Sequence, residues 1–343
     1  MKYFKWSYII TVLGLLLAYF WGEHVHAGSG FACVFIASVL GVLEVSLSFD
    51  NAVVNAMKLE TMSELWRRRF ITWGIAIAVF GMRFLFPLLI VSIFAKVNIL
   101  KVLHIALSDA SQYAYYLHQA HAPIVTFGGA FLTMLFLGYF MNPQKDVDWM
   151  PFEKHLRCVK GVKILDTLIA LALVDVVQMV QPPPLRVKVL ISGIAGILTY
   201  LLIDTISRKL EDLDKNRKKC DCVVTTGFSY SCFVSFMYLE LIDASFSLDG
   251  VLGAFALSSD IVIITIGLTI GAMFVRSLTI MLVDKKTLNE LIYLEHCAHW
   301  AIGVLAILML ASTVFIVPEV VTGLSGLLII IGSLISSIRA RRA

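Results

Sequence analysis

Long apolar blocks separated by short polar segments extend over nearly the whole chain. Most blocks hold about twenty residues or more, the length that an α-helix needs to cross a hydrocarbon layer of about 30 Å. They lie at about residues 7–21, 31–57, 70–94, 122–141, 162–181, 187–206, 227–258, 259–283, 298–316 and 319–338. This pattern predicts an all-α polytopic membrane protein of about ten transmembrane helices, folded as a single integral membrane domain over residues 1–343.

Three segments qualify this pattern. The stretch Ile99–Ala120 is mixed in polarity, so we expect a helix that lies in the membrane interface. The triple proline Pro182–Pro184 cannot continue a helix and marks an external turn between the fifth and sixth spans. The basic and then apolar start of the chain is compatible with a signal peptide cut after Ala27 or with an uncleaved first helix, which we favour.

Composition and charge support the membrane class and predict an orientation. Hydrophobic residues make up 59% of the chain and charged residues 15%, against about 45–50% and about 25% in an average soluble domain. With a cytoplasmic N-terminus, 22 of the 28 Lys and Arg residues are cytoplasmic, four are external and two lie within spans. This excess follows the positive-inside rule, so both termini are predicted to be cytoplasmic. The net charge of +4 lies in loops and gives no basis for a nucleic-acid partner.

An internal repeat organises the chain. The sequence LEVSLSFDNAV at Leu43–Val53 is echoed by LIDASFSLDGVL at Leu241–Leu252, and in the next span Arg83 aligns with Arg276. Because the matched spans are the second and the seventh, the two copies are predicted to run in opposite directions. Such inverted repeats are common in transporters, whose site lies near the midplane where the copies meet. We assign residues 31–141 to the first repeat, 142–226 to linking helices, 227–316 to the second repeat and 317–343 to a final helix with a basic cytoplasmic tail.

Oxygen-bearing side chains recur along one face of the second span. The spacing i, i+4, i+7, i+11 places four of them on that face, namely Glu44, Ser48, Asn51 and Asn55. Asp50 and Ser46 form a second strip well over 90° away, so either the polar face is very wide or the helix is interrupted. An interruption would expose backbone carbonyl groups as further ligands.

The seventh span repeats this pattern of acids and hydroxyl groups. Asp243 and Ser247 share one strip, Ser245 and Asp249 share the other, and Glu240 lies one turn before them. Carboxylate, hydroxyl and amide oxygens are hard ligands that suit Mn²⁺, Mg²⁺ or Ca²⁺. The predicted metal ligands are Glu44, Asp50, Asn51, Glu240, Asp243 and Asp249, with Ser48, Ser247, Arg83, Arg276 and Asp175 in supporting roles.

An alternative is that these acids only pair with the two intramembrane arginines and hold the helices together. Ionisable groups inside a bilayer cost at least about 2.5–3.5 kcal/mol each, and five acids exceed what two arginines can neutralise. We therefore favour a cation site. Arg83 and Arg276 either hold the empty site together and then release it, or are ordinary ion-pair partners without a part in transport. Asp175 in the fifth span is a candidate for supporting the ligands or relaying protons.

Two HxxH pairs also match between the copies, His118 with His121 and His296 with His299. This spacing places both imidazoles on one helical face and can hold Zn²⁺ or Mn²⁺. We favour interfacial histidines at helix starts, because in oppositely oriented copies the two pairs fall at opposite membrane surfaces. Alternatively, one pair could bind the ion where it enters the protein and the other pair where it leaves, so that the four histidines belong to an access path.

Four motifs in order resemble the TerC superfamily of bacterial and chloroplast membrane proteins, named from tellurium resistance and related to the LysE group of exporters. They are LEVSLSFDNAVVNA, WRRRFITWGIAIAVFGMRFLFPLLIVS, IVTFGGAFLTMLFL and FSLDGVLGAFAL, and the likeness covers most of the chain. It implies an acidic motif in each half and a link to manganese export and metal-stress resistance. By motif position it reaches Glu44, Asp50, Asn51, Asp243 and Asp249.

One position departs from the family's pattern, because Gly250 stands in the second copy where the family often has a small polar residue. The second half would then contribute fewer ligands than the first. The resemblance also includes a thylakoid member tied to membrane-protein insertion, which keeps a role without transport open.

These patterns together predict a secondary transporter of the bacterial cytoplasmic (inner) membrane that exports Mn²⁺, or else Ca²⁺ or Mg²⁺, in exchange for protons. The chain contains no GxSxG, GxxxxGK[ST] or HExxH motif, so we predict neither an enzyme nor an ATP-driven pump, and no tightly bound cofactor. The expected partners are the lipid bilayer, the divalent cation as substrate and, as an option, a second copy of the chain in a homo-oligomer. The alternatives are a membrane assembly or metalation factor, and an amino-acid or small-ion exporter whose arginines bind a substrate carboxylate.

Overall fold

All regular structure described by the computed structural model is helical. It describes residues 3–342 apart from 26, 61, 142–163, 220–232, 238, 242, 244–249, 251–253, 255–256, 259, 285–292 and 316, and these residues contain no strand. Five of their helices are long and apolar enough to cross a membrane: Lys5–Val25, Gly30–Leu47, Tyr115–Phe140, Pro183–Lys209 and Ile261–Asp284. The predicted all-α class is therefore confirmed, whereas the count of ten spans stays a prediction.

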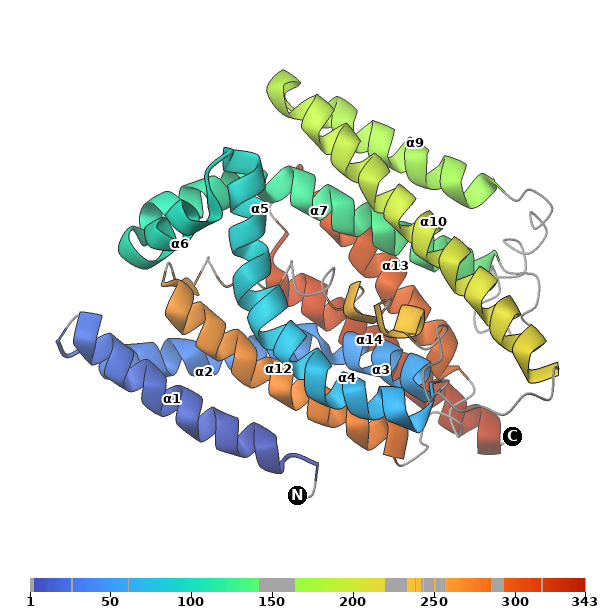
Figure 1. Ribbon diagram of the computed structural model, residues 1–343, viewed down its shortest axis with the longest axis horizontal. Coiled ribbons are helices and arrows are strands. Elements are labelled where there is room, and N and C mark those ends of the chain that lie inside the picture. Colours follow the sequence, from blue (N-terminus) through green and yellow to red (C-terminus); the bar gives the residue numbers. More distant parts are fainter. Residues whose placement is uncertain are drawn as a thin grey trace.

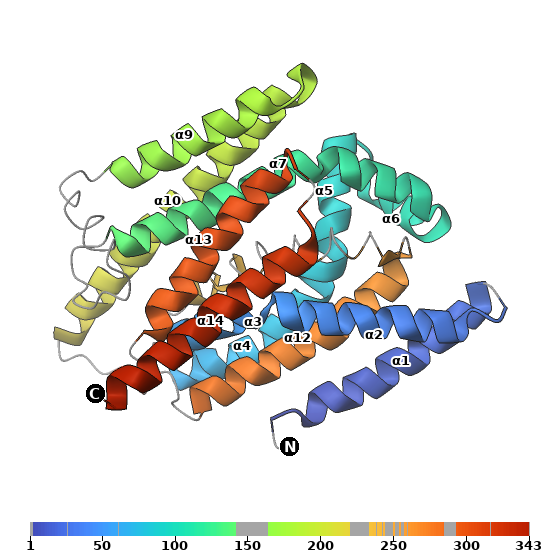
Figure 2. The same cartoon turned by 180° about the vertical axis from the view of Figure 1, so that it is seen from behind.

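The helices form a bundle in which α12 and α7 have the most neighbours. In chain order they are α1 (Lys5–Val25), α2 (Gly30–Leu47), α3 (Phe49–Glu60), α4 (Glu64–Ala76), the π-helix η1 (Ile77–Leu85), α5 (Phe86–Ala95), α6 (Ile99–Ser108), α7 (Ala110–Phe140), α9 (Leu165–Val180), α10 (Pro183–Lys219), α12 (Ile261–Asp284), α13 (Leu294–Ser312) and α14 (Glu319–Arg342). Helix α12 packs along α1, α2 and α3, while α7 packs along α10 and α13. The α9–α10 hairpin and α1 lie on opposite sides of the bundle (Figures 1 and 2).

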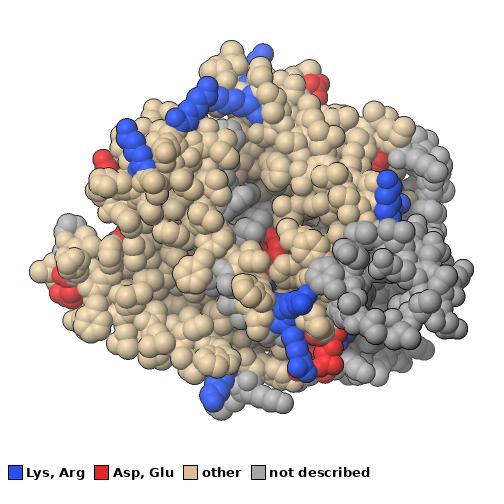
Figure 3. All heavy atoms as spheres, in the orientation of Figure 1, with Lys and Arg blue, Asp and Glu red and all other residues tan. Residues whose placement is uncertain are grey.

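The interior is packed while much of the exterior is apolar. The largest core cluster joins α3, α7, α9, α10 and α13 and contains Phe131, Val174 and Ile302. Large apolar side chains such as Phe35 and Leu198 are nevertheless exposed, and charged side chains are sparse over the described surface in view (Figure 3). A packed helical interior with an apolar outside is the arrangement that lipid requires of a membrane-spanning bundle.

The second predicted span, residues 31–57, is broken at Ser48. Helix α2 ends at Leu47 and α3 begins at Phe49, with Ser48 at φ −101° and ψ 17°, outside the helical region. The interruption proposed from the two polar strips is therefore present. The third predicted span is also divided, since the π-helical turns of η1 separate α4 from α5.

The segment Ile99–Ala120 is not a single helix, so that part of the prediction was wrong, while its place in the membrane interface stays a prediction. Asp109 divides it, because its carboxylate accepts a hydrogen bond from the Gln112 N–H at 3.0 Å and caps α7. Residues 110–120 then continue through Pro123 into the predicted fourth span as one helix of 31 residues. The mixed polarity hid a short apolar helix, α6, followed by the polar first turns of a long one.

The turn predicted at the triple proline is present. Helix α9 ends at Val180, and Pro183 and Pro184 form the first turn of α10, where a missing N–H is tolerated. Gln181 in this turn is buried, and its side-chain amide donates to the Thr313 carbonyl at 3.0 Å. The turn is therefore fixed to the end of α13.

Helix α1 is docked on the bundle rather than isolated. The Ser7 hydroxyl is fully buried and donates to the Met273 carbonyl on α12 at 2.8 Å, and it lies 2.7 Å from the Ser277 hydroxyl. At the other end of α1, the Trp21 indole N–H donates to Asp260 at 2.8 Å. These contacts hold both ends of α1 against α12 and the residue before it, and the absence of cleavage stays a prediction.

Candidate functional site

The site begins where α2 and α12 approach closely. A Cβ atom added to Gly267 would lie 2.9 Å from the Ala37 carbonyl oxygen, and one added to Gly271 would lie 2.7 Å from the Gly41 carbonyl oxygen. Both distances are too short for a side chain, so these glycines allow the two backbones to meet. The contact also buries Glu44, of which only 2% is exposed, against Gly271.

The break at Ser48 holds the Glu44 carboxylate in place. The Ser48 hydroxyl donates to Glu44 Oε1 at 3.0 Å, and the Ser48 N–H donates to the Glu44 carbonyl at 2.9 Å. Beyond the break, Asn51 and Asn55 are also buried on α3. The four polar residues that share a face in the sequence pattern are thus all turned to the interior.

Two acids from the predicted second repeat approach this face. Asp243 Oδ1 accepts a hydrogen bond from the Asn51 side-chain amide at 2.5 Å. Glu240 is 3% exposed, and its Oε1 lies 3.9 Å from Arg276 Nη2 on α12. Among the described residues, neither carboxylate oxygen of Glu240 accepts a hydrogen bond. The structure therefore brings the polar face of α3 together with acids of the predicted second repeat.

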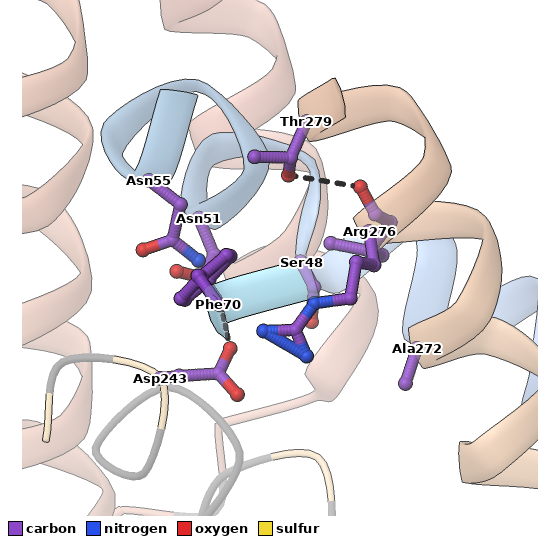
Figure 4. A pocket seen from close by; sticks show the side chains of 9 residues that line it. Ser48, Asn51, Asn55, Phe70, Asp243, Ala272, Arg276 and Thr279 are labelled. Atoms are coloured by element: carbon purple, nitrogen blue, oxygen red, sulfur yellow. Dashed lines mark hydrogen bonds between the residues drawn. The ribbon is translucent and has the colours of Figure 1, made fainter. Parts of the chain in front are cut away.

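A small cavity lies between these groups. Its volume is 20 Å³, which is room for about one water molecule. The residues that line it are Ser48, Asn51, Asn55, Phe70, Asp243, Ala272, Val275, Arg276 and Thr279. Figure 4 shows the side chains of Asp243 and Arg276 directed into the same space beside Asn51 and Phe70. The cavity therefore presents one carboxylate, several neutral oxygens and one guanidinium group.

Arg276 has a specific seat in the site. Its Cζ lies 4.1 Å from the centroid of the Phe70 ring, a distance at which a guanidinium interacts favourably with the aromatic face. A Cβ atom on Gly74 would lie 2.5 Å from Arg276 Nη2 and 2.6 Å from Glu240 Oε1. The ion pair of Arg276 and Glu240 thus occupies space that exists because residue 74 carries no side chain.

The contacts that residues 243 and 250 make with α2 and α3 are in antiparallel order. Asn51 contacts Asp243, and a Cβ atom on Gly250 would lie 2.9 Å from Glu44 Oε2. Residue numbers thus increase in one segment where they decrease in the other. Helix α12, in contrast, runs parallel to α2, since Gly41 is next to Gly267 and Glu44 is next to Gly271.

Part of the predicted ligand set falls outside the described structure. Ser247 and Asp249 are outside the described residues, and the side chains of Asp50 and Arg83 are not described either. Within the described part of the chain, no three His, Cys, Asp or Glu side chains converge to hold a metal ion. Asp243 is thus the described carboxylate that lines the cavity, and the roles predicted for the other acids stay predictions.

The predicted histidines are separated and do not reach the cavity lining. His118 and His121 lie in the first half of α7. His299 stacks on the Tyr139 ring near the end of α7, with 3.4 Å between centroids, and the buried His296 lies 3.4 Å from the Tyr139 hydroxyl. Residues 121 and 139 are about 27 Å apart at 1.5 Å per helical residue. The two histidine pairs are therefore too far apart to bind one metal ion together. The distance is compatible with one pair near each membrane surface.

Asp175 is also outside the cavity lining. It accepts a hydrogen bond from the Gln178 side-chain amide at 2.9 Å, and its helix α9 packs on α7 and α10. Conversely, the sequence analysis missed Phe70, Gly74 and Thr279. Thr279 lies one turn after Arg276 and could have been found from that spacing. An apolar ring and a glycine in an apolar helix carry no comparable signal.

Several apolar helices around a packed interior define the chain as a multi-pass membrane protein. It belongs to the family described as "Protein of unknown function (DUF475)", which matches residues 49–343. Over 107 residues it is 32% identical to the uncharacterized membrane protein YceF of Bacillus subtilis (strain 168), a match that covers 31% of this chain and 40% of that protein. The chain thus matches less than half the length of this relative. No solved structure matches the chain.

Proposed function

We propose that the protein is a membrane transporter that exports a divalent cation, Mn²⁺ in the first place, across the bacterial cytoplasmic membrane. The observation that carries this proposal is the convergence of Asp243, Asn51 and Asn55 on a cavity inside the bundle. These are oxygen donors of the kind that bind Mn²⁺, Mg²⁺ and Ca²⁺. A charged group buried among membrane spans is a functional candidate because its burial is expensive.

The size of the cavity favours an ion over an organic substrate. A volume of 20 Å³ accommodates about one water molecule, and therefore one ion without its hydration shell. An amino acid needs several times that space. Arg276 has the charge to bind a substrate carboxylate, but the small volume of the cavity argues against an amino-acid exporter.

The contacts of the two acidic motifs support the inverted repeat as part of this proposal. In the sequence alignment, Asn51 corresponds to Gly250, and Asp243 corresponds to Glu44. Exchanging each residue for its counterpart converts the Asn51–Asp243 contact into the Gly250–Glu44 contact, and both occur. A two-fold axis between the copies produces such reciprocal contacts.

The axis would pass through the site, as in transporters built from inverted repeats. The two halves would not be equivalent, because Asn51 provides an amide where Gly250 provides no side chain. We propose that the ion binds on the Asn51–Asp243 side, with Asp50 and Asp249 as the additional carboxylates. The TerC-like motifs supply the same residues by resemblance, and manganese export in this chain rests on that resemblance and on the oxygen chemistry.

A membrane assembly factor is the second candidate, and one observation favours it. Arg276 pairs with Glu240 inside the bundle, as expected if acids and arginines only hold helices together. Glu240 does not line the cavity, however, whereas Asp243 does. Neutralising Asp243 therefore separates the two candidates better than neutralising Glu240.

The experiment compares Mn²⁺ binding to purified protein and cellular manganese for the parent, Asp243→Asn, Asp50→Asn and Asp249→Asn. Asp204→Asn is the matched control, since Asp204 pairs with Arg208 at 2.9 Å on α10 and does not line the cavity. Each of the three acid variants should weaken Mn²⁺ binding by at least about tenfold and raise cellular manganese, while the control resembles the parent. If all three acid variants match the parent at equal membrane abundance, the acids are structural and the assembly factor is favoured.

A further inference from the structure

Arg276 is a permanent positive charge in a cavity that is otherwise suited to a cation. It is 8% exposed, lines the cavity with Asp243, and has its guanidinium over the Phe70 ring. Its Nη2 lies 3.9 Å from Glu240 Oε1, which is an ion pair but longer than a hydrogen bond. The guanidinium therefore lies near the acid without a hydrogen bond to it, and it also contacts the aromatic face.

This arrangement would allow the Arg276 side chain to move away from Glu240. A bidentate hydrogen-bonded pair of arginine and carboxylate fixes both groups in one geometry. The Arg276–Glu240 pair lacks that geometry, because neither Glu240 oxygen accepts a hydrogen bond from a described residue. Gly74 leaves the space in which the two side chains meet. The Arg276 side chain could therefore rotate without breaking a bidentate hydrogen bond to Glu240.

An arginine cannot relieve a conflict of charge by losing its proton, since its pKa lies far above physiological pH. A divalent ion beside Asp243 would share a small, poorly solvated cavity with the guanidinium, and like charges repel strongly there. The conflict can be relieved only if Arg276 moves away from the ion. Once the ion has left, the buried acids again require a positive partner.

We propose that Arg276 is a tethered counter-cation of the transport site. It offsets part of the negative charge of Glu240 and Asp243 while the cavity is empty, is displaced from the Phe70 face when a divalent cation enters, and returns as the cation leaves. Arg276 then lowers the affinity for the ion and promotes its release. This inference rests on the proposed function, because Arg276 would compete with the same divalent cation that the protein is proposed to transport.

The test measures Mn²⁺ binding to the purified full chain in lipid nanodiscs, together with efflux from proteoliposomes. Arg276→Met removes the charge and keeps an unbranched chain, and it should tighten Mn²⁺ binding by at least about tenfold while slowing efflux. Arg276→Lys keeps a positive charge and should bind Mn²⁺ much as the parent does. Arg208→Met is the matched control, because Arg208 is exposed and paired on α10, and it should leave both measurements unchanged.

A second variant keeps Arg276 and covers the case in which Arg276→Met does not fold. Phe70→Leu removes the aromatic seat, whose contribution corresponds to about a two- to fivefold change in equilibrium, and it should tighten Mn²⁺ binding by that factor. Weaker binding in folded Arg276→Met, restored by Arg276→Lys, would make Arg276 a positioning residue and overturn the proposal. Unchanged Mn²⁺ binding in Phe70→Leu would also count against it.

The outcome for the parent protein separates this inference from the proposed function. If the parent binds Mn²⁺ and Arg276→Met binds it no more tightly, only the counter-cation is overturned. If the parent binds none of Mn²⁺, Mg²⁺ and Ca²⁺, the transport function and the counter-cation are both overturned.

Discussion

The close approach of α2 and α12 can be tested by adding one methyl group. In Gly271→Ala, the new Cβ atom would lie 2.6 Å from Glu44 Cγ and 2.7 Å from the Gly41 carbonyl oxygen. Carbon atoms in contact are normally about 3.5–4.0 Å apart, so α2 would have to move by about 1 Å. The Gly41 oxygen belongs to the backbone and cannot turn away.

The expected free-energy cost follows from comparison with a glycine that has no such neighbours. Gly332 on α14 has nothing within 4 Å of its added Cβ atom. Both substitutions gain about 1 kcal/mol from the helix propensity of alanine, so this contribution cancels between them. Overpacking of a filled interior costs about 1–3 kcal/mol. Gly271→Ala should therefore be about 1–3 kcal/mol less stable than Gly332→Ala.

Thermal unfolding of the two variants in the same detergent, followed by near-ultraviolet circular dichroism, measures this difference. We expect Gly332→Ala to unfold at or above the temperature of the parent and Gly271→Ala to unfold several degrees lower. If Gly271→Ala is as stable as Gly332→Ala, α2 and α12 do not meet at this point. The burial of Glu44 against α12 would then be wrong as well.

Two further predictions concern α1 and the orientation of the chain. Ser7→Ala removes the hydroxyl that donates to the Met273 carbonyl and lies beside the Ser277 hydroxyl. This loss should destabilise the protein by about 0.5–1.5 kcal/mol, and an unchanged unfolding temperature would mean that α1 is not docked. In intact cells, an impermeant thiol reagent should label Lys101→Cys and not Glu64→Cys, and the reverse pattern would contradict cytoplasmic termini.

The helical positions of the polar residues could be predicted because they depend only on local periodicity. Glu44, Ser48, Asn51 and Asn55 lie on one face in the sequence pattern, and all four are buried. The angle between this face and Asp50 indicated either a very wide polar face or an interrupted helix, and α2 ends at Leu47. The exact position of the break could not be predicted, because it depends on the hydrogen bond between the Ser48 hydroxyl and the Glu44 carboxylate.

Periodicity failed where helix ends are decided by individual side chains. The mixed segment before His118 was interpreted as one interfacial helix, whereas Asp109 caps a new helix inside it. A stretch of average polarity cannot reveal such a boundary. The same limit applies to α4, η1 and α5, where one continuous apolar block becomes three helical segments.

The sequence by itself determined the helical membrane class and the acidic motif of each half. Long apolar blocks, and carboxylates placed within them, can be recognised from composition and local order alone. Only the tertiary structure decided which of these groups meet. Asn51 and Asp243 are 192 positions apart in the chain and form a hydrogen bond, while Arg276 lies over Phe70 in space left by Gly74. These contacts depend on the close packing of helices distant in sequence, which is set by small residues and shape rather than by periodicity.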